Sequence, residues 1–575
     1  MTEPIKLSPL DTHFADFIVR IDRHHGDELW WGAALASYSA GRGHTCFNLF
    51  KAVNGTPLPP VHGHGVHTSP PSDVRHWLES LERCDTVGVP GAYTPLVLDP
   101  AGRLYLHRCW EYEQQIATGI LSRIRPHAID ETLLDTALDR YFPAMDGVPD
   151  LQRSAARMAL THGFSVISGG PGTGKTATVA RILALLLDVA GDSSPEIALA
   201  APTGKAALRL HQSILQAAGR LDLPDKIKKC LPVGVSTIHR LLGVQARRGG
   251  FRHNRTNRLA CDTLVIDEAS MVDLQLMASL LEALRDDARV ILLGDRNQLA
   301  SVEAGAVLAD MCDSAVRAPV PVTQLTKSYR FGADSGIAVL SQLINSGDSA
   351  AVRELLKSGR YPDIVWRTLP TGRAFETAFA ESARDGYSEY AQATSPSEAL
   401  AALESFKILS PLRSGPNGTE TLNRLCESAL ASGRRLDSHG SRPQPVMVTG
   451  NNYELGLFNG DTGIIMDSDG TSSVWFEHPE GGLRHFSKLR VPPSETAFAL
   501  TIHKSQGSEF DRILLILPEY LSDVLSRELL YTAVTRARRS IEIWGTEEIV
   551  SQTVARRTVR TSGLIDRLAE GGCHE

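Results

Sequence analysis

The glycine-rich stretch at 169–176 constrains the fold of this chain more than any other part of the sequence. It consists of Gly169, Gly170, Pro171, Gly172, Thr173, Gly174, Lys175 and Thr176, and so matches the pattern G-x-x-x-x-G-K-[ST]. An apolar run at 164–168 precedes it, and an apolar stretch of helical length at 177–187 follows. In such a strand–loop–helix unit, the backbone N–H groups of the loop point inward at phosphate oxygens. The stretch therefore predicts an α/β fold with a nucleotide-phosphate site at one edge of a parallel sheet.

Length and composition narrow the class of protein. A chain of 575 residues is long enough for two to four domains, and its net charge of −7 excludes a uniformly basic nucleic-acid coat. The eight cysteines show no C-x-x-C spacing, which argues against a zinc ribbon or a disulfide framework. No signal-peptide layout is present, and the longest apolar run, at 182–187, is far shorter than the ~20 residues that a bilayer requires. We therefore expect a reduced, soluble, cytoplasmic protein that contacts no membrane.

Short apolar runs alternate with longer helical stretches twice along the chain, which is typical of parallel sheets. The first set of runs covers 164–168, 197–201, 263–267 and 289–294, and the second covers 406–410, 498–502, 513–517 and 540–544. Short strands separated by Gly, Asn and Asp at 440–493 predict a small β-rich insertion. We expect an N-terminal α+β domain at 1–125, a first parallel-sheet lobe at 126–320 and a second at 321–575.

Two carboxylates indicate that the bound nucleotide is hydrolysed. Asp267 and Glu268 directly follow the apolar run at 263–266. Lys175 would supply a point charge to the β- and γ-phosphates, and Thr176 and Asp267 would hold Mg²⁺. Glu268 would orient and polarise the attacking water. A strand that ends in Asp-Glu is by itself usually just a solvated strand end, but together with the phosphate loop it predicts an ATPase.

Four further segments decide the class of ATPase. They read Ala-Pro-Thr-Gly-Lys-Ala-Ala at 201–207, Leu-Gly-Asp-Arg-Asn-Gln-Leu at 293–299, Thr-Ile-His-Lys-Ser-Gln-Gly-Ser-Glu-Phe at 501–510 and Tyr-Thr-Ala-Val-Thr-Arg-Ala-Arg-Arg at 531–539. In this order they resemble the motifs of superfamily 1 helicases. The whole set resembles the RecD family, the subunits of RecBCD (exonuclease V) helicase–nucleases. The resemblance implies two RecA-like lobes with ATP between them, single-stranded DNA across both, and 5′→3′ translocation.

The same resemblance implies roles for single residues. Gln298 matches the residue that senses the γ-phosphate, and Arg330, in Lys-Ser-Tyr-Arg, matches an arginine that reaches ATP from the second lobe. Arg536 matches the arginine of the last motif. The positions that match nucleotide contacts elsewhere in the family are Gln152, Gly507 and Glu509. For Arg330 the alternative is a surface salt bridge, and for Gln152 it is an ordinary polar residue on a helix face.

A local basic stretch predicts the contact with DNA. Residues 226–258 hold nine Lys and Arg and no Asp or Glu. The proposed contacts are Thr203, His239, Arg240, Arg247, Arg248, Arg252, Arg255 and Arg258. Hydroxyl, imidazole and guanidinium donors suit backbone phosphates and would give binding without sequence readout. The stretch at 247–258 is open to two interpretations, a hairpin that splits duplex DNA or a solvated basic loop.

Residues 1–125 contain 11 Lys and Arg against 13 Asp and Glu, which argues against DNA binding there. The region is rich in tryptophan, with Trp30, Trp31, Trp77 and Trp110. The resemblance implies that this domain docks on a large partner subunit, whereas the alternative is that its aromatic side chains fill its own core. His62, His64 and His67 stand at a spacing that would allow metal binding, but no fourth ligand is evident and a flexible loop is the simpler interpretation.

The sequence as a whole predicts an ATP- and Mg²⁺-dependent 5′→3′ DNA helicase subunit. It would unwind double-strand-break ends for recombinational repair together with RecB-like and RecC-like subunits. The sequence shows no separate nuclease signature, so exonuclease activity is expected only in the complex. The first alternative is a stand-alone RecD-like helicase, against which we count the 168 residues that precede Gly169, fewer than in that group. The second is a nucleotide switch without motor activity, which the full catalytic set opposes.

Overall fold

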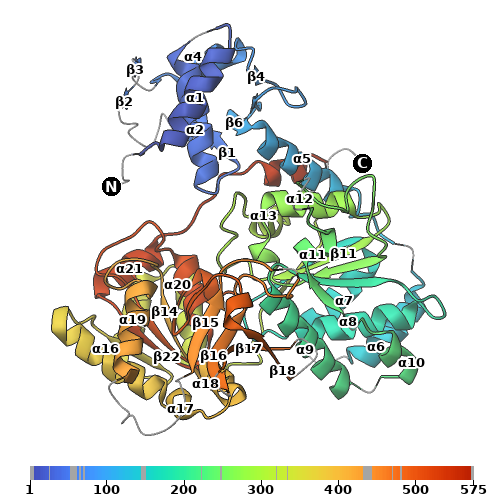
Figure 1. Cartoon of the computed structure of the whole chain (residues 1–575). Coiled ribbons are helices and arrows are strands. Elements are labelled where there is room, and N and C mark those ends of the chain that lie inside the picture. The colour runs from blue at the N-terminus through green and yellow to red at the C-terminus, as the bar shows by residue number, and fades with distance from the viewer. Residues whose placement is uncertain are drawn as a thin grey trace.

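The computed structural model shows an N-terminal domain above two lobes that lie side by side (Figure 1). It describes residues 5–24, 26–51, 61–63, 66–68, 71–127, 129–143, 150–221, 223–232, 234–245, 249–318, 320–332, 334–431, 443–452, 454–468, 471–478 and 482–571. Both lobes are parallel α/β sheets, which confirms the predicted fold class.

The first lobe is built on a six-stranded sheet in the order β12-β7-β11-β10-β8-β9. All of its neighbouring strands pair in parallel. The strands are β7 (Phe164–Gly169), β8 (Ile197–Ala201), β9 (Val235–Thr237), β10 (Thr263–Ile266), β11 (Arg289–Gly294) and β12 (Val322–Leu325). Four of them match the predicted runs. Strand β12 pairs with β7, so the first lobe extends past the boundary that we expected at 320.

Helices cover both faces of this sheet. They are α6 (Glu131–Tyr141), α7 (Leu151–Thr161), α8 (Lys175–Val189), α9 (Gly204–Arg220), α10 (Asp225–Cys230), α11 (Ile238–Leu242), α12 (Leu274–Ala283) and α13 (Val307–Ser314), with a 3₁₀ turn η1 (Ala269–Met271). Helix α8 is the most deeply embedded, and its side chains from Val179 to Leu187 are largely buried between α6, α7, α9 and the sheet. The helix that follows the phosphate loop is therefore fixed by packing along its whole length.

The second lobe has a five-stranded parallel sheet in the order β13-β22-β21-β14-β20. Its strands are β13 (Ile364–Arg367), β14 (Phe406–Ser410), β20 (Ala499–Thr501), β21 (Phe510–Ile516) and β22 (Ala537–Trp544). Its helices are α14 (Gly336–Ser346), α15 (Ser349–Ser358), α16 (Gly372–Gly386), α17 (Ser388–Gln392), α18 (Pro396–Ser405), α19 (Thr419–Ala431), α20 (Arg527–Val534) and α21 (Glu547–Ala555), with a 3₁₀ turn η3 (His503–Ser505).

The predicted β-rich insertion forms a separate five-stranded antiparallel sheet in the order β18-β17-β16-β15-β19. Its strands are β15 (Gln444–Val448), β16 (Thr462–Ser468), β17 (Thr471–Glu477), β18 (Leu483–Ser487) and β19 (Ser494–Thr496), with a 3₁₀ turn η2 (Lys488–Arg490). Val448, Val474 and Phe476 belong to its small core. The insertion therefore packs as a unit beside the second lobe, where it faces the first.

The N-terminal domain has a four-stranded sheet in the order β1-β6-β5-β4 with helices against it. Its elements are α1 (Pro9–Ile21), α2 (Asp27–Gly41), β1 (Cys46–Asn48), α4 (Val74–Glu82), β4 (Val87–Gly88), β5 (Leu96–Leu98) and β6 (Arg103–Leu106), and a two-stranded ribbon of β2 (Val61–Gly63) and β3 (Val66–Thr68) is separate. Trp30, Trp31 and Trp77 expose at most 6% of their surface. The idea that they form a docking surface is therefore wrong, because they fill the core of the domain.

Helix α5 (His107–Leu121) belongs physically to the first lobe as much as to the N-terminal domain. It packs against α12, and its Ile116 and Ile120 share a core with Leu281 of that helix. Trp110 on the same helix is half-buried against this core. The domain boundary that we expected at 125 therefore cuts through a packed interface, and removing 1–125 would expose part of the core of the first lobe.

The C-terminal strap, residues 556–571, runs back from the second lobe to the N-terminal domain and the first lobe. Residues 556–563 have no regular structure, and helix α22 (Leu564–Gly571) then packs against α5 and α13. In Figure 1 the strap is the red segment that rises from the second lobe toward α5. The chain therefore connects the lobes twice, once between β12 and α14 and once through this strap.

Three observations concern metal, thiol and membrane chemistry. The histidines proposed as metal ligands, His62, His64 and His67, have side chains outside the described residues. Elsewhere in the described chain no group of three or more His, Cys, Asp or Glu is placed to hold a metal ion. The seven cysteines within the described ranges are free thiols, and no described helix combines the length and apolarity that a membrane span requires.

Candidate active site between the two lobes

The loop between β7 and α8 has the shape of a phosphate cradle. Gly172 and Gly174 have φ of +73° and +79°, a backbone conformation that favours glycine. At Gly172 a Cβ atom would lie 2.3 Å from Cβ of Arg330, so no side chain fits there. Helix α8 begins at Lys175, and its first N–H groups and the positive end of its dipole therefore face the loop.

Lys175 lies across this loop. Its Nζ donates to the carbonyl oxygens of Gly169 at 2.6 Å and Gly170 at 3.1 Å. Thr176 is half-buried in the first turn of α8. Thr173 also stabilises the loop, because its hydroxyl donates to the carbonyl oxygen of Gly170 at 2.8 Å. The ammonium of Lys175 is thus held against the loop that the glycines form.

Three carboxylates follow the neighbouring strands β10 and β11. Burial, and next the charge of Glu268, raise the pKa of Asp267 to about 6, while Lys175 acts in the opposite direction. Burial also raises the pKa of Asp295, again opposed by Lys175. Because β10 and β11 are parallel neighbours of each other, and β11 also pairs with β7, these carboxylates share the sheet edge with the phosphate loop. The sheet itself therefore brings Lys175 and its counter-charges together.

Glu268 has a strained backbone. Its φ of +52° is the only positive value among non-glycine residues in the part of the chain that the structure describes. Its N–H donates to Oδ1 of Asp267 at 2.8 Å, which links the two acidic residues directly. Left-handed conformations of non-glycine residues are costly and occur preferentially at functional sites. The strain turns the backbone sharply after β10 and is consistent with a catalytic position.

The segment after β11 bonds to the second lobe. Gln298 is 6% exposed and its amide contacts Asp295 at 3.4 Å. The hydroxyl of Tyr531 donates to Asp295 at 2.8 Å, and it would lie 3.1 Å from a Cβ at Gly170. The N–H of Leu299 donates to Oγ1 of Thr532 at 3.0 Å. Helix α20 of the second lobe is therefore hydrogen-bonded to the segment 295–299, here called the sensor segment, and lies beside the phosphate loop.

Arg330 lies directly on the phosphate loop. The preceding residue, Tyr329, donates its N–H to the carbonyl oxygen of Gly172 at 2.7 Å. Arg330 donates to the carboxylate of Glu509 through Nη2. Its Nη1 is buried and has no hydrogen-bond partner among the described residues. A buried cationic donor without a partner is costly, so this atom marks a position for an anionic acceptor.

Glu509 is the centre of an arginine junction that joins the lobes. Its carboxylate pairs with Arg209 of α9, with Arg330 and with Arg538 of β22. Burial would raise the pKa of Glu509, but the guanidinium groups around it outweigh burial and lower that pKa to about 2. Arg536 contributes to this lowering as well. One carboxylate thus faces several arginines, which leaves a positive excess beside the phosphate loop.

Arg536 is almost fully buried, with 2% of its surface exposed. Its Nε and Nη1 donate to the carbonyl oxygens of Thr532 at 3.2 Å and Ser508 at 3.1 Å. These hydrogen bonds stay within the second lobe. The structure therefore places Arg536 behind Glu509, whereas Arg330 is the arginine that touches the loop.

Gln152 lies on the other side of the loop. Its Nε2 contacts the carbonyl oxygen of Thr173 at 3.4 Å, and a Cβ at Gly174 would lie 2.8 Å from the same nitrogen. The ring of Tyr329 is 3.6 Å from that Cβ position. Gln152 and an aromatic ring thus flank the phosphate loop together, an arrangement that suits the base of a nucleotide.

A groove of about 630 Å³ runs between the two lobes and the β-rich insertion. Its lining includes Lys205, Ser236, Thr237 and Arg240 from the first lobe, Glu404, Lys407 and Phe510 from the second, and Phe458, Asp461 and Glu477 from the insertion. The side chain of Thr203 caps α9, and a Cβ at Gly507 would lie 3.7 Å from its hydroxyl. The groove therefore contains parts of the motifs that we assigned to DNA.

Two lysines face one aromatic ring in this groove. The ammonium groups of Lys205 and Lys407 lie 5.8 Å and 5.5 Å from the centre of the Phe510 ring. Burial, and next the charge of Lys205, lower the pKa of Lys407 to about 7. Lys407 and Phe510 are each only 2% exposed, and the ammonium of Lys407 donates to the carbonyl oxygen of Ala497 at 3.0 Å, so this cluster lies beneath the groove and does not form an open stacking surface. The groove also contains acidic side chains, so its positive charge is local and not uniform.

The basic stretch at 226–258 does not form one patch. Arg247 and Arg248 lie outside the described residues. Arg252 and Arg255 are exposed, as are His239 and Arg240, whereas Arg258 is half-buried. Arg258 bonds to the carbonyl of Leu284 and to Asp286 at 2.9 Å. Those partners precede β11, so Arg258 stands at the sheet edge opposite the phosphate loop, apart from the groove between the lobes, and its contact with DNA stays a prediction.

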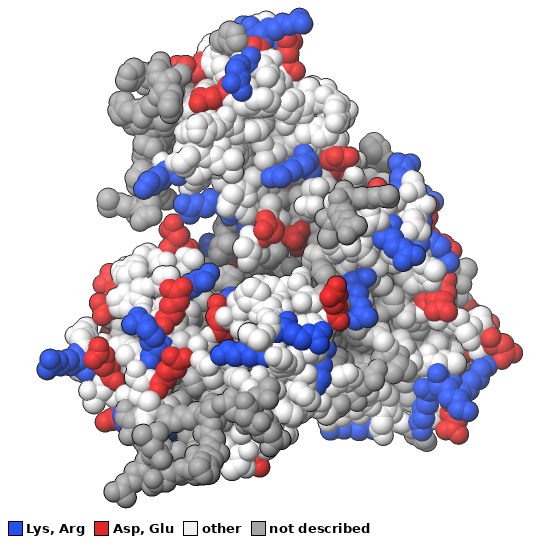
Figure 2. All heavy atoms as spheres, in the orientation of Figure 1, with Lys and Arg blue, Asp and Glu red and all other residues white. Residues whose placement is uncertain are grey.

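Charges of both signs are interspersed over the face of the molecule that Figure 2 shows. On that view no large field of one sign covers either lobe. Strand β9 is also an edge strand of the first sheet, so 226–258 is not simply an inserted DNA-binding loop. A count of charges along the chain could not show that these basic residues lie apart, because it does not tell which edge of the sheet each arginine occupies.

Sequence reasoning also missed two residues of the site. Arg209 pairs with Glu509 and lowers the pKa of Asp267, so it lies between the acidic pair and the arginine junction. Its position could have indicated this role, because Arg209 lies six residues after Thr203 on α9, the helix that follows the Ala-Pro-Thr-Gly-Lys motif. The second is Tyr531, which begins the last motif in the sequence and bonds to Asp295.

Three family models match the chain. One described as an AAA domain matches residues 152–304, and one described as the UvrD-like helicase C-terminal domain matches 496–541. The third, described as the RecBCD enzyme subunit RecD N-terminal domain, matches 4–105. The first two lie on the phosphate loop and on the motifs of the second lobe. The two-lobed fold and these matches define an ATP-dependent DNA helicase.

Full-length relatives identify the family. The RecBCD enzyme subunit RecD of Mycobacterium tuberculosis is 38% identical over 98% of this chain and 95% of its own length. The subunit of the same name from Haemophilus influenzae is 35% identical over 80% of each chain. The ATP-dependent RecD2 DNA helicase of Deinococcus radiodurans is 31% identical over 81% of this chain and 59% of its own length. The chain belongs to the RecD family of RecBCD enzyme subunits.

Proposed function

We propose that this chain is the ATP-driven motor subunit of a RecBCD-type complex. It would move 5′→3′ along single-stranded DNA and unwind double-strand-break ends for recombinational repair, in the cytoplasm where the chromosome lies. One observation carries the proposal: the phosphate loop of the first lobe lies against Arg330, whose buried Nη1 has no partner among the described residues. That arrangement suits an anion held between the lobes.

The residues at the site fit ATP and Mg²⁺. The glycine cradle and Lys175 suit the phosphates, and the donor without a partner on Arg330 suits a further phosphate oxygen. Asp267 and the hydroxyl of Thr176 are the oxygen ligands that Mg²⁺ prefers, and they would hold it. When bound, the metal would neutralise charge that develops on the phosphates. Glu268 would orient the attacking water and accept its proton.

The lobe interface accounts for coupling between hydrolysis and movement. Arg330 can stabilise the charge of the transition state only while the lobes are closed on the nucleotide. The DNA groove is lined by both lobes, so any change in their distance also changes the groove. Hydrolysis would thus alter the fit between the groove and the strand.

The N-terminal domain is proposed to dock on RecB-like and RecC-like subunits. Its tryptophans are buried, but Leu10, Phe17 and Ile21 of α1 are exposed and recur on one helix face. Tyr93 is 96% exposed in the loop before β5. Exposed apolar side chains that cluster on one element are typical of protein interfaces. Exonuclease activity would then belong to the assembled complex.

The test of the motor function is Lys175→Gln, assayed for ATP turnover with and without single-stranded DNA. We expect turnover to fall to background while the melting temperature stays the same, because the ammonium is removed from a half-buried loop. Lys6→Gln, at an exposed position outside the basic stretch at 226–258, is the matched control. Normal turnover in a folded Lys175→Gln protein would remove this lysine from the site, and a wild-type chain without DNA-stimulated turnover would reject the motor function.

A second candidate function is that of a stand-alone helicase, which the likeness to the RecD2 helicase of Deinococcus radiodurans supports. Copurification at native expression separates the two. Two large subunits that elute with this chain in fixed ratio support the complex, and Phe17→Asp should release them because it charges the exposed face of α1. A chain that elutes alone and unwinds DNA alone supports the second candidate.

A further inference from the structure

We propose that Arg560, in the C-terminal strap, is a positioning residue for ATP hydrolysis that holds the sensor segment containing Gln298 in place. The inference rests on the proposed ATPase function and adds a residue outside every motif discussed above. Arg560 lies 262 residues after Gln298 in the sequence, and it reaches that segment only because the strap crosses back from the second lobe.

Arg560 binds three backbone carbonyls of one short loop. Its Nη1 donates to Glu303 and Gly305, both at 2.7 Å, and its Nη2 donates to Ser301 at 2.5 Å. A planar guanidinium can serve several acceptors at fixed angles, which an ammonium on a flexible chain cannot do. The loop at 301–305 has no regular secondary structure. Besides Arg560, the hydroxyl of Ser301 and the N–H of Leu274 donate to its carbonyl oxygens, so Arg560 supplies three of its several attachments.

The N-terminal domain supports the same loop from the other side. Gly43 has φ of +86°, and a Cβ there would lie 2.9 Å from Cζ of Arg560, so the guanidinium packs on bare backbone. The carbonyl oxygen of Gly43 accepts a hydrogen bond from the N–H of Gly305 at 3.0 Å. The loop is thus held between a turn of the N-terminal domain and the strap.

This loop continues directly from the sensor residues. Two hydrogen bonds from the second lobe hold Leu299, one to Thr532 at 3.0 Å and one from Gln506 at 3.1 Å. The segment 295–305 is therefore fixed at its beginning by the ATP-facing elements of the second lobe and at its end by Arg560. Gln298 directly precedes Leu299, lies between that residue and Asp295, to which Tyr531 of the second lobe donates a hydrogen bond, and is buried.

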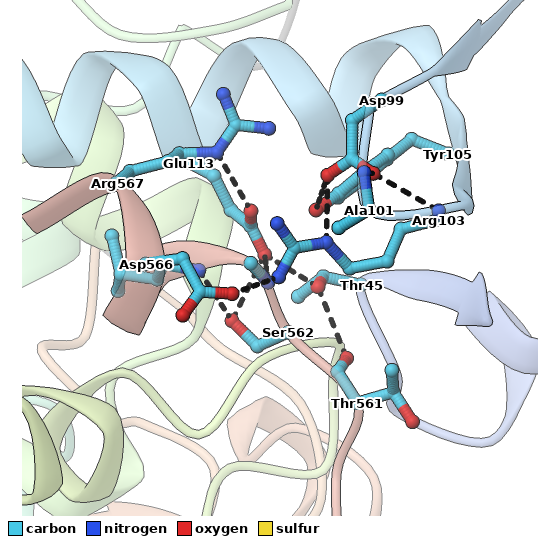
Figure 3. A network of polar contacts seen from close by, with 12 residues as sticks. Thr45, Asp99, Ala101, Arg103, Tyr105, Glu113, Thr561, Ser562, Asp566 and Arg567 are labelled. Carbon is cyan, nitrogen blue, oxygen red and sulfur yellow. Dashed lines mark hydrogen bonds and ion pairs between the residues drawn. The ribbon is translucent and has the colours of Figure 1, made fainter. Parts of the chain in front are cut away.

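The strap itself is firmly anchored next to Arg560. The N–H of Thr561 donates to Nδ1 of His44 at 2.9 Å. The fully buried carboxylate of Glu113 accepts hydrogen bonds from Ser562 at 3.0 Å and from the N–H of Gly563 at 3.1 Å. Figure 3 shows this network between α5 and the strap. Arg560 therefore acts from a fixed support, which a positioning residue requires.

A displaced loop should affect the reaction more than it affects the fold. Small misplacements of a group that acts in the transition state can lower a rate by up to ~10²-fold even when the substitution is remote. The proposed ATP contacts lie in the loop at 169–176 and not at 301–305, so ATP binding should be nearly unaffected. A purely structural role would instead lower the melting temperature and change the Michaelis constant and turnover together.

The experiment compares Arg560→Ala, Arg560→Lys and Arg557→Ala in the full chain. Arg557 is exposed in the same strap and makes no hydrogen bond or ion pair among the described residues, which makes it the matched control. We expect DNA-stimulated kcat to fall by about tenfold to a hundredfold in Arg560→Ala, with KM for ATP within a factor of about two. Arg560→Lys should be intermediate, and the control should equal the wild type.

A double-mutant cycle with Gln298→Ala tests the route of the effect. If Arg560 acts through Gln298, adding Arg560→Ala to Gln298→Ala should change kcat little further. Independent, multiplicative losses would overturn the inference, as would a folded Arg560→Ala protein with kcat within about twofold of the wild type. If Arg560→Ala fails to fold, Arg560→Lys in the same cycle decides. A wild type without ATPase activity would instead reject the proposed function on which this rests.

Discussion

The molecule contains two buried carboxylates at junctions between its bodies, and their surroundings differ in a telling way. Glu509, between the lobes, faces three paired arginines, one of which keeps a buried donor without a partner among the described residues. Glu113, under the strap, is 0% exposed and is surrounded by matched donors. It accepts hydrogen bonds from Thr45 at 2.5 Å and from Arg567 at 3.1 Å, as well as from the strap backbone (Figure 3).

The difference separates a binding site from a structural joint. Around Glu113 the charges and hydrogen bonds are satisfied within the chain, and Arg103 serves the nearby Asp99 and Asp566 in the same way. Around Glu509 three arginines share one carboxylate, and Nη1 of Arg330 is left without a hydrogen-bond partner among the described residues. Buried polar groups are normally satisfied, so a cluster that is incomplete without an anion indicates where one binds.

The largest effect should come from Arg330→Ala, which removes the donor that lacks a partner. Turnover should fall by about 10³- to 10⁵-fold, because an arginine of this kind stabilises the charge of the transition state. ATP affinity, measured by equilibrium titration, should change far less. Arg538→Ala is the matched control, since Arg538 pairs with the same Glu509 but is more exposed. Equal losses in the two variants would mean that the junction is structural throughout.

Glu113→Ala should have the next largest effect, on stability. It leaves Arg567 and the neighbouring donors buried without their acceptor, and such losses destabilise by about 3–5 kcal/mol. Thermal unfolding of the full chain measures the change. Glu111→Ala, an exposed carboxylate two residues earlier on α5, should stay within about 0.5 kcal/mol of the wild type. A Glu113→Ala protein as stable as this control would contradict the assignment of the strap as a joint.

Asp310, on α13 beside the strap, should make stability depend on pH. Burial raises the pKa of Asp310 to about 7, and the nearby charges of Glu113 and Asp313 act in the same direction. A hydrogen bond from Ser562 and the charge of Arg560 act in the opposite direction. The folded state therefore binds a proton that the unfolded state releases near pH 4, so its stability falls as pH rises from about 4 to about 7. The loss in the free energy of unfolding over this pH range is at most about 4 kcal/mol.

Asp310→Asn, which carries no titrating proton, should not show this fall. Unfolding curves of both proteins between pH 4 and pH 8 give the comparison, and the advantage of the variant should grow as pH rises. Asp313→Asn, at a half-exposed position on the same helix, is the control. Parallel curves for Asp310→Asn and the wild type would show that the carboxyl group of Asp310 titrates as in the unfolded chain.

The smallest effect concerns the basic stretch and the dependence of DNA binding on salt. Neutralising Arg252 and Arg255, which are exposed, should each lower the log–log salt slope for single-stranded DNA by ~0.7 if they contact phosphates. Arg258→Gln should leave the slope unchanged, because Arg258 pairs with Asp286 at the far sheet edge. A lower slope for Arg258→Gln would show that Arg258 contacts DNA phosphates in spite of this ion pair.

Local patterns in the sequence predicted the sheets and the phosphate loop well. Apolar runs of strand length ending in Gly or Asp predicted β7, β8, β10 and β11, because a buried parallel strand requires such a run and a polar turn after it. The short strands of the insertion were equally evident from their Gly, Asn and Asp boundaries. Strand β9 was hidden because its three residues, Val235–Thr237, are too few for a periodic signal.

Features that depend on distant contacts could not be predicted. Thr45 and Thr561 are hydrogen-bonded across 516 residues, so no local pattern indicates the strap or the role of Arg560. The tryptophans of the N-terminal region were misread because composition does not distinguish a core from an interface. The position of Arg258 could not be predicted for a similar reason, since a run of charges does not reveal which edge of a sheet each one occupies.

The double connection between the lobes restricts how they can move. A body attached at one point can swivel about three axes, whereas a body attached at two separated points turns freely only about the line that joins them. The second lobe is attached to the first by the chain between β12 and α14 and by the strap (Figure 1). Opening and closing should therefore follow one hinge axis, and successive cycles would displace the groove between the lobes along the same arc each time.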